Sequence, residues 1–435
     1  MLYDLIIVGG GVAGLRVAIK ALKKRPSIKC CILEKYGYIG GRVVTFRKDI
    51  PKVGEVQWEN GAGRISTYHK GVLKLFKKYG LTFVPIDDAT SFVNDPAISG
   101  KEPVIKWNTF SDLIDYYLGP ISCLDREMLA TNTLKDLLDM VIGPGSARDF
   151  YIQFPYYSEI HTLRADLALE AFHNEMKSNS GFGVCKEGLG ALADAMMNDF
   201  LSRGGEIIMD CAVTAVENNP DNSVSLTVKR EGKKEKFTGG AVVLALHHKA
   251  LTEIDGVRGL PVLKHLTMEP LLRMYAIFPS KGGVSWFSGL NKIVTDSTVR
   301  YIIPIDSKKG IVMISYTDGA DASYWIKAGS KRSGEDNVKD MVMTEIRKLF
   351  PDASIPDPLF FKQHPWYDGC SYWLPGNYSV IEESYRSLHP LPKDIPNLFM
   401  TGESFAVKQC WIESALTQAD KLLELREFKE VLRSI

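Results

Sequence analysis

Three glycines and one carboxylate near the start of the chain have the types and spacing needed to hold a dinucleotide. Gly9, Gly11 and Gly14 follow a short apolar segment, and Glu34 stands beyond them at the separation of about 20 residues that this pattern requires. The first glycine allows a tight turn, the second lets the backbone approach a pyrophosphate, and the third lets a helix pack closely on a strand. A carboxylate at Glu34 accepts hydrogen bonds from ribose hydroxyls. A glycine-rich turn in another α/β sheet is the alternative.

The residues around these glycines predict the strand, helix and strand that such a site requires. Residues 3–8 are apolar or β-favouring at nearly every position, which indicates a buried parallel strand. Residues 12–24 have apolar side chains at helical spacing and end in basic residues, and residues 28–34 indicate a second strand. The start of the helix, at Val12 and Ala13, would present free N–H groups to an anion.

Helix and strand patterns alternate along the rest of the chain, without repeats or a low-complexity linker. Helices are predicted at 70–80, through much of 109–180 and at 409–430, and strands at 206–209, 213–217, 224–229, 241–246 and 397–401, with a hairpin over 300–316. This order predicts a chain that leaves the nucleotide-binding domain and later returns to it.

A second glycine-rich segment follows Glu34 directly. It runs from Lys35 to Arg42, where Gly40 and Gly41 allow close approach of the backbone and Arg42 can neutralise a cofactor phosphate. The run resembles the Glu-x-x-x-x-x-Gly-Gly-Arg signature of FAD-containing amine oxidoreductases, the superfamily of monoamine and polyamine oxidases. An exposed loop with an incidental arginine is the alternative reading.

The resemblance continues over essentially the whole chain. Residues 59–65 resemble the segment that passes over the flavin, 213–216 the strand that pairs with the adenine, and 401–403 with 410–415 the closing motif. The resemblance implies that the helix N-terminus near Ile412 faces the pyrimidine oxygen of the flavin. The positive end of the helix dipole would then stabilise the reduced, anionic flavin. The implied cofactor-binding residues are Gly9, Gly11, Val12, Ala13, Gly14, Glu34, Lys35, Gly40, Gly41, Arg42, Gly61, Ala62, Gly63, Arg64, Val213, Gly402, Glu403, Trp411, Ile412 and Ala415.

The fold class that follows is α/β. The resemblance implies an FAD-binding, two-dinucleotide-binding (Rossmann-type) domain made of residues 1–85, 181–258 and 386–435. A discontinuous α+β substrate domain, with a helical insert and an antiparallel sheet, is assigned to residues 86–180 and 259–385.

Aromatic residues are the candidates for the reacting face, because flavin chemistry needs orientation and a dry pocket more than acid–base help. In the amine oxidases two rings flank the substrate nitrogen. Trp411 falls at one of these positions in the closing motif. Tyr372, or alternatively Trp366, is the candidate for the other, and core packing is the alternative for both.

Two positions depart from the family pattern or leave a choice open. Arg273 stands where many members have a lysine that holds a water near the flavin, and arginine does not replace lysine geometrically. Arg273 is therefore either a catalytic residue that holds the water or a residue of the strand surface. Cys370 lies where monoamine oxidases attach the flavin covalently; a small packed residue is the other reading.

The function predicted from these features is FAD-dependent oxidation of a small-molecule amine (primary, secondary or polyamine) by hydride transfer to flavin N5, with O2 as the acceptor. Three alternatives remain: a carotenoid- or porphyrinogen-type flavin enzyme, a flavin-binding protein without amine oxidase activity, and an NAD-dependent dehydrogenase. The Gly-Gly-Arg motif and Gly402-Glu403 oppose the last.

Composition sets the remaining expectations. The 435 residues are 45% hydrophobic and 24% charged with a net charge of +1, which favours neither nucleic acid nor anionic membrane as a partner. No apolar run reaches the roughly 18 residues of a membrane helix.

The seven cysteines show no paired metal spacing, so we expect no metal and a reducing, cytoplasmic setting. Cys30 and Cys31 should face opposite sides of their strand. Nothing in the sequence indicates the oligomeric state.

Overall fold

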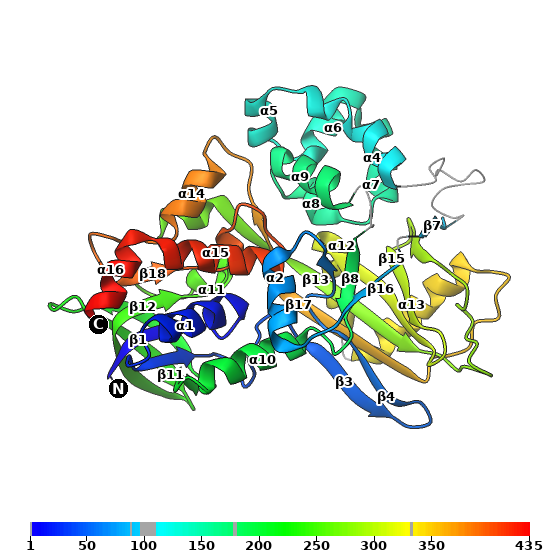
Figure 1. The fold of residues 1–435 in the computed structure, drawn as a ribbon. Coiled ribbons are helices and arrows are strands. Elements are labelled where there is room, and N and C mark those ends of the chain that lie inside the picture. Colours follow the sequence, from blue (N-terminus) through cyan, green and yellow to red (C-terminus); the bar gives the residue numbers. More distant parts are fainter. Residues whose placement is uncertain (1, 88, 96–109, 177–180, 331–333) are drawn as a thin grey trace.

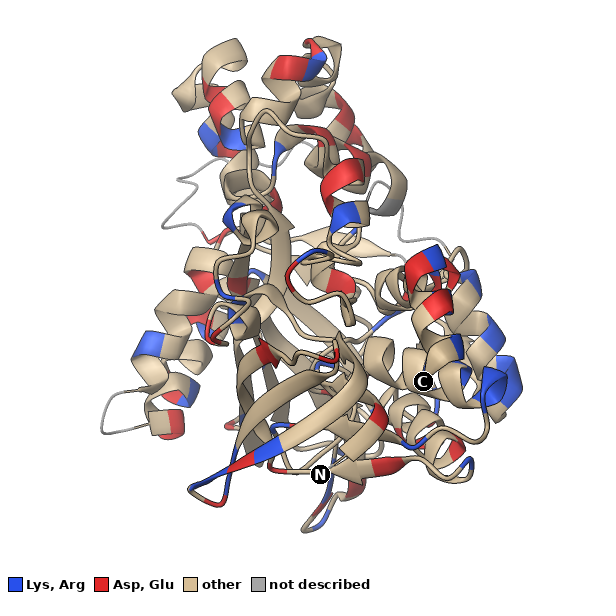
Figure 2. Cartoon of the chain, turned by 90° about the vertical axis from the view of Figure 1, so that its left-hand side faces the viewer, with Lys and Arg blue, Asp and Glu red and all other residues tan. Residues whose placement is uncertain are grey.

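The computed structural model describes residues 2–87, 89–95, 110–176, 181–330 and 334–435. Figure 1 shows a nucleotide-type sheet with its helices, a second sheet beside it, and a group of short helices above the second sheet. Figure 2 shows acidic and basic residues interspersed over the chain, in keeping with the small net charge. None of the helices in these ranges is long and apolar enough to cross a membrane.

The first sheet is built from three separate stretches of the chain. Its parallel strands are β1 (Leu2–Val8), β2 (Cys30–Leu33), β9 (Glu206–Ile208), β12 (Lys233–Leu244) and β18 (Leu398–Met400). The antiparallel strands β10 (Ala212–Asn218) and β11 (Val224–Arg230) extend it along the first half of β12. The sheet order is β10-β11-β12-β1-β2-β9, with β18 also paired to β12.

Helices cover this sheet because its strands are apolar on both faces. Leu5 and Ile7 pack in one core cluster with α1 (Val12–Lys24), α10 (Gly190–Leu201) and α15 (Ile412–Glu424). Alternate strand residues such as Ile6 belong to a second cluster on the other face. Cys30 and Cys31 fall in the two different clusters, which confirms that they point in opposite directions.

The second sheet is mostly antiparallel, in the order β17-β13-β16-β15-β14-β7. Its strands are β17 (Phe360–Trp373), β13 (Leu266–Ile277), β16 (Ile311–Asp318), β15 (Tyr301–Asp306), β14 (Lys292–Val294) and β7 (Thr90–Phe92). Helices α12 (Gly319–Gly329) and α13 (Gly334–Leu349) pack with it around a third apolar cluster.

Smaller elements complete the fold. Two small sheets pair β3 (Thr45–Ile50) with β4 (Gly54–Glu59), and β8 (Phe182–Cys185) with both β5 (Ile65–Ser66) and β6 (Phe83–Pro85). The helical group contains α4 (Phe110–Leu118), α5 (Arg126–Thr131), α6 (Leu134–Ile142), α7 (Pro144–Gln153), α8 (Tyr157–His161) and α9 (Ala165–Ala171). The other α-helices of the described residues are α2 (Lys70–Tyr79), α11 (His248–Leu251), α14 (Val380–Arg386) and α16 (Arg426–Ser434).

The structure confirms most predicted elements and corrects two. The helix over 12–24 and the hairpin within 300–316 are present, and the helical stretch within 109–180 is confirmed where the residues are described; 109 and 177–180 lie outside the described residues. The predicted helix over 409–430 is wrong in extent, because α15 begins only at Ile412 and extended backbone at Leu425 separates it from α16. The strand predicted at 241–246 is the end of a longer one, β12, which stops at Leu244.

Candidate functional site

A cavity of about 840 Å³ lies between the two sheets and takes its walls from both. All predicted site residues except one line it: Gly9, Gly11, Val12, Ala13, Glu34, Lys35, Gly40, Gly41, Arg42, Gly61, Ala62, Gly63, Arg64, Val213, Arg273, Trp366, Tyr372, Gly402, Glu403, Trp411, Ile412 and Ala415. The exception is Gly14. A Cβ there would lie 2.1 Å from the Gly9 carbonyl oxygen, so Gly14 serves the packing of α1 against β1.

The glycine turn after β1 forms one wall of the cavity. Gly9 has a φ of 105°, and a Cβ on it would lie 2.5 Å from the Ala245 carbonyl oxygen, so only glycine fits. Gly11 precedes α1, and a Cβ on it would meet no atom within 4 Å. No side chain caps the N-terminus of α1, and its first turn has no acidic residue. The amide groups and the positive end of the helix dipole are therefore available to an anion.

Glu34 stands at the carboxyl end of β2, beside this turn. Its Oε2 accepts the Gly10 N–H at 2.7 Å and its Oε1 accepts the Tyr36 N–H at 2.9 Å. The side chain is 6% exposed, and burial raises the pKa of its carboxyl while these amide bonds oppose the rise. Each oxygen keeps a further lone pair, so the carboxylate can accept ribose hydroxyls while it shapes the turn. Val213, on β10, lines the cavity as well.

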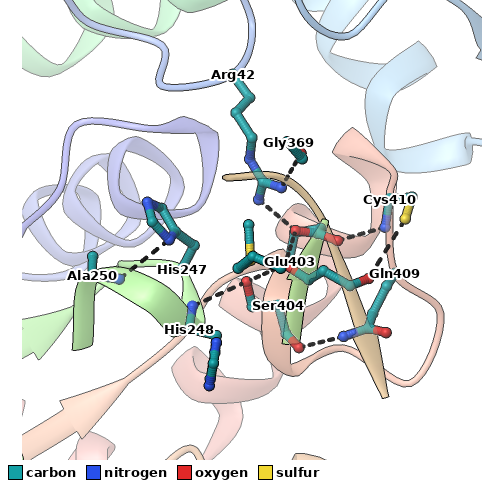
Figure 3. A network of polar contacts seen from close by, with 11 residues as sticks. Arg42, His247, His248, Ala250, Gly369, Glu403, Ser404, Gln409 and Cys410 are labelled. Carbon is teal, nitrogen blue, oxygen red and sulfur yellow. Dashed lines mark hydrogen bonds and ion pairs between the residues drawn. The ribbon is translucent and has the colours of Figure 1, made fainter. Parts of the chain in front are cut away.

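Arg42 and Glu403 form an ion pair that joins the N-terminal motif to the closing motif (Figure 3). Arg42 Nη1 also donates to the Gly369 carbonyl at 2.9 Å, and the Cys410 N–H donates to Glu403. A phosphate role for Arg42 was expected from the sequence; in the structure its guanidinium is already shared with these two acceptors. Arg42 therefore holds three segments of the cavity wall together.

Trp411 lies among charged and aromatic side chains at the start of α15. Its ring centroid is 5.8 Å from that of Phe182 and 4.7 Å from that of His69, and the Arg64 guanidinium lies 5.7 Å above it. Burial lowers the pKa of His69 to about 4, with Arg64 contributing, so this imidazole is neutral at pH 7. The Trp411 ring is therefore held between two uncharged rings, Phe182 and His69, and has one charged neighbour, the Arg64 guanidinium.

The other predicted aromatic residues come from β17. Tyr372 is 2% exposed, and its hydroxyl donates to Glu159 Oε1 at 3.2 Å. Trp366 donates from Nε1 to the Asn60 carbonyl at 2.9 Å and packs on Gly61, where a Cβ would lie 3.3 Å from the ring. Both rings line the same cavity as Trp411.

Arg273 projects from β13 to the same cavity. Its guanidinium occupies the space above Gly63, where a Cβ would lie 2.4 Å from Nη1, and it lies 5.3 Å from the Tyr316 ring centroid. Nη1 is 3.5 Å from the Glu59 carbonyl oxygen. The glycine at position 63 thus makes room for the arginine, and Arg273 belongs to the cavity wall.

Several cavity residues were not predicted from the sequence. Glu159 and Tyr156 come from the start of α8, and Tyr316 and Asp318 from the end of β16. Asp318 accepts the N–H groups of Tyr157 and Ser158, while burial raises the pKa of its carboxyl to about 6. No motif marks these positions, because their approach depends on how the helical group packs on the second sheet.

A doubly covered parallel sheet with a glycine turn, a buried ribose-type carboxylate and an adjoining cavity defines a dinucleotide-binding oxidoreductase. Residues 12–421 match the model of the family described as flavin-containing amine oxidoreductase. The chain belongs to this family, and its cofactor is a flavin.

Solved structures show the same fold at low sequence identity. A proposed protoporphyrinogen oxidase from Exiguobacterium sp. 255-15 is 16% identical over 98% of both chains, with a TM-score of 0.74. A single mutant of a putrescine oxidase, made in a redesign of its cofactor binding, is 15% identical over 100% of both chains, with a TM-score of 0.73. The wild-type putrescine oxidase bound to putrescine is 15% identical over 98% of this chain and 99% of that one, with a TM-score of 0.70. No curated protein matches the sequence significantly.

The residues present fit FAD. The open space at Gly11 leaves room for a pyrophosphate, and Glu34 is held in place by backbone amides that leave its oxygens able to accept ribose hydroxyls. At α15, the Glu413 side chain does not cap its own helix but accepts the N–H groups of Gly71 and Val72 at 2.8 and 2.9 Å. The amides at the start of α15 thus stay available for an electron-rich ring edge.

Proposed function

We propose that this FAD enzyme oxidises an amine, with O2 as the electron acceptor. The observation that carries the proposal is that Trp411 and Tyr372 line the same cavity as the glycine turn and the start of α15. When bound, the flavin supplies a hydride acceptor at N5 for the carbon next to the amine nitrogen, and the imine product hydrolyses in water. The aromatic walls exclude water and orient the nitrogen.

The charged groups of the cavity support a narrower substrate class, an amine that also carries a carboxylate. Arg64 and Arg273 both line the cavity, and Tyr316 interacts electrostatically with each of them. Guanidinium groups are permanently charged and match a carboxylate geometrically. Glu159 and Asp318 line the same space and can accept an ammonium group. A zwitterionic substrate complements both the guanidiniums and the carboxylates of the cavity wall.

Anaerobic mixing of the purified holoenzyme with matched substrates tests two claims: that the substrate is an amine, and that this amine carries a carboxylate. We expect flavin absorbance near 450 nm to bleach with an amino acid such as phenylalanine, and less rapidly with phenethylamine, which lacks the carboxylate. Diamines such as putrescine form the third arm. If no amine in the panel bleaches the flavin, the amine assignment is wrong and a non-amine substrate, as in the porphyrinogen-type enzymes, takes its place.

A variant separates carboxylate recognition from the chemistry. Arg64→Gln removes the charge while keeping a planar polar group. We expect kcat/KM for phenylalanine to fall roughly 10- to 100-fold further than kcat/KM for phenethylamine. Phenylalanine alone loses a charged hydrogen bond, whereas both substrates lose the Arg64 contact with the Trp411 ring. An equal fall for both substrates would contradict a carboxylate site at Arg64. Readmission of O2 after bleaching tests the acceptor, since it restores the oxidised spectrum only if Arg273 permits that reaction.

A further inference from the structure

His247 is a polar residue of the cavity wall that neither the sequence motifs nor the proposed reaction uses. It follows the carboxyl end of β12 and lines the cavity, whereas the next residue, His248, does not. The preceding residue, Leu246, lies between the two glycine segments of the site: a Cβ on Gly9 would lie 3.1 Å from the Leu246 side chain, and a Cβ on Gly402 would lie 3.2 Å from the Leu246 carbonyl oxygen. His247 is therefore placed beside the turn that begins the dinucleotide fingerprint.

The capping bond of His247 fixes which ring nitrogen carries the proton. Nδ1 accepts the Ala250 N–H at 3.3 Å and so caps the short helix α11 (Figure 3). A ring nitrogen that accepts a hydrogen bond has no proton, so the imidazole is neutral and its proton is on Nε2. Burial, followed by the charge of Arg42, lowers the pKa of His247 to about 3, in keeping with a neutral ring at pH 7.

The Nε2–H group of this ring is available to a ligand. Nε2 has no hydrogen-bond partner among the residues that the structure describes, and it is not one of the polar atoms that the protein encloses without a partner. Nδ1 of His248, in contrast, is enclosed in that way. Because the His247 side chain lines the cavity, its remaining donor opens into it.

The pyrophosphate of the cofactor needs donors at this end of the cavity, because its oxygens only accept hydrogen bonds. The amides at the start of α1 satisfy some of them. Arg42, the phosphate ligand expected from the sequence, is engaged by the Gly369 carbonyl and by Glu403. A neutral N–H at His247 adds a donor without placing a second buried cation beside Arg42.

We propose that His247 donates a hydrogen bond from Nε2 to a phosphate oxygen of the FAD pyrophosphate, and so helps to hold the cofactor. The two ring nitrogens then have separate roles, since Nδ1 caps α11 and Nε2 binds the anion. The cap also orients the ring, because the bond to Ala250 leaves Nε2 as the nitrogen that can reach a ligand. This contact is independent of the substrate that the enzyme oxidises.

Two substitutions separate these roles because their amide groups end at different distances from the backbone. The Asn side chain reaches about as far as Nδ1, so His247→Asn keeps an acceptor for the Ala250 N–H and loses the more distant donor. The Gln side chain reaches about as far as Nε2, so His247→Gln keeps an N–H donor there and loses the cap. The same change at the next residue, His248→Asn, lies outside the cavity lining and is the matched control.

The rate at which the holoenzyme releases FAD measures the contact without any substrate. Apo-glucose oxidase in excess, which regains activity when it takes up free FAD, reports the release. We expect His247→Asn to release FAD roughly 10- to 100-fold faster than the wild type, the scale of one hydrogen bond to a charged group. His247→Gln and His248→Asn should stay within about threefold of the wild type. If His247 acts only as a helix cap, His247→Gln releases FAD as fast as His247→Asn or faster, and the proposal is wrong.

The 31P NMR spectra of the same holoenzymes distinguish the pyrophosphate from other parts of the cofactor. We expect a pyrophosphate resonance to move in His247→Asn and to lie near its wild-type position in His247→Gln. Unchanged 31P resonances in His247→Asn, or FAD release from it within about threefold of the wild-type rate, would overturn the proposal. His247→Ser, which keeps a capping oxygen without the distant donor, is the second variant if the asparagine protein folds poorly.

Discussion

Removal of the Trp411 ring is the perturbation that bears most directly on the proposed reaction. In Trp411→Ala the cavity keeps its glycine turn, Glu34 and the amides at the start of α15, because none of these depends on the indole. The substitution removes only the ring that lies between Arg64, Phe182 and His69. We therefore expect FAD content to stay near one per chain while the reaction with an amine slows.

The size of the effect follows from the contacts of the ring. The Arg64 guanidinium at 5.7 Å from the Trp411 ring contributes about 0.5–2 kcal/mol as a cation–π interaction. The packing against Phe182 and His69 contributes about 0.5–1.5 kcal/mol. If these contacts hold the wall in the geometry that the reaction requires, their loss costs about 1–3.5 kcal/mol, which slows reduction roughly 5- to 400-fold.

Stopped-flow reduction under anaerobic conditions measures this step alone. Trp411→Phe should recover much of the rate, since a phenyl ring keeps the aromatic wall. Tyr385→Ala, at an exposed position of α14 outside the cavity, is the surface control and should behave as the wild type. If a cognate amine reduces the flavin of Trp411→Ala at the wild-type rate, the Trp411 ring serves only in packing. If this variant loses FAD, the ring helps to hold the cofactor.

Four further outcomes follow. Gly11→Val places a branched side chain in the space left for the pyrophosphate, so it should abolish FAD binding; full flavin content after purification would refute the fingerprint. Glu34→Gln should weaken FAD by about 1.5–3 kcal/mol, or roughly 10- to 100-fold by titration; Glu34→Ala should also lower the melting temperature of the apoprotein, because the N–H groups of Gly10 and Tyr36 lose their acceptors. Acid denaturation should release the flavin, whereas colour that stays on the protein and is lost in Cys370→Ser would establish a covalent bond. Arg273→Lys should speed reoxidation by O2 without a comparable change in anaerobic reduction, because a compact ammonium holds a water in a geometry that a planar guanidinium does not reproduce; an unchanged reoxidation rate would show that Arg273 does not limit this step.

Local chemistry explains why the first βαβ unit could be predicted, with its helix correct to the residue and its strands within about two residues. The glycine turn, the apolar spacing and the terminal lysines of α1 all act within a few residues, and the structure has the helix from Val12 to Lys24 as predicted. The long strands β13 and β17 carried weaker signals. Pro270 interrupts the pattern of β13, and the structure places it at a register shift between the strands, where the missing N–H is tolerated. The break at Leu425 was missed because the helical pattern continues on both sides of it.

The cavity residues that belong to one local segment could be predicted from the sequence. Those that tertiary packing brings to the cavity from distant segments could not. Glu34 and the glycines come from one local unit, whereas Glu159 and Asp318 reach the cavity through the docking of α8 on β16. A residue whose role depends on such docking carries no local mark, so only the assembled fold reveals it.

Glu403 shows how the assembled site depends on the end of the chain. This buried carboxylate binds Arg42, the Ser371 hydroxyl and the Cys410 N–H, which come from three segments far apart in the sequence. An uncompensated buried charge costs several kcal/mol, so the ion pair is stable only when both partners are in place. Arg42 and Glu403 stand in the first and last motifs of the chain, so these two motifs complete one wall of the cavity between them.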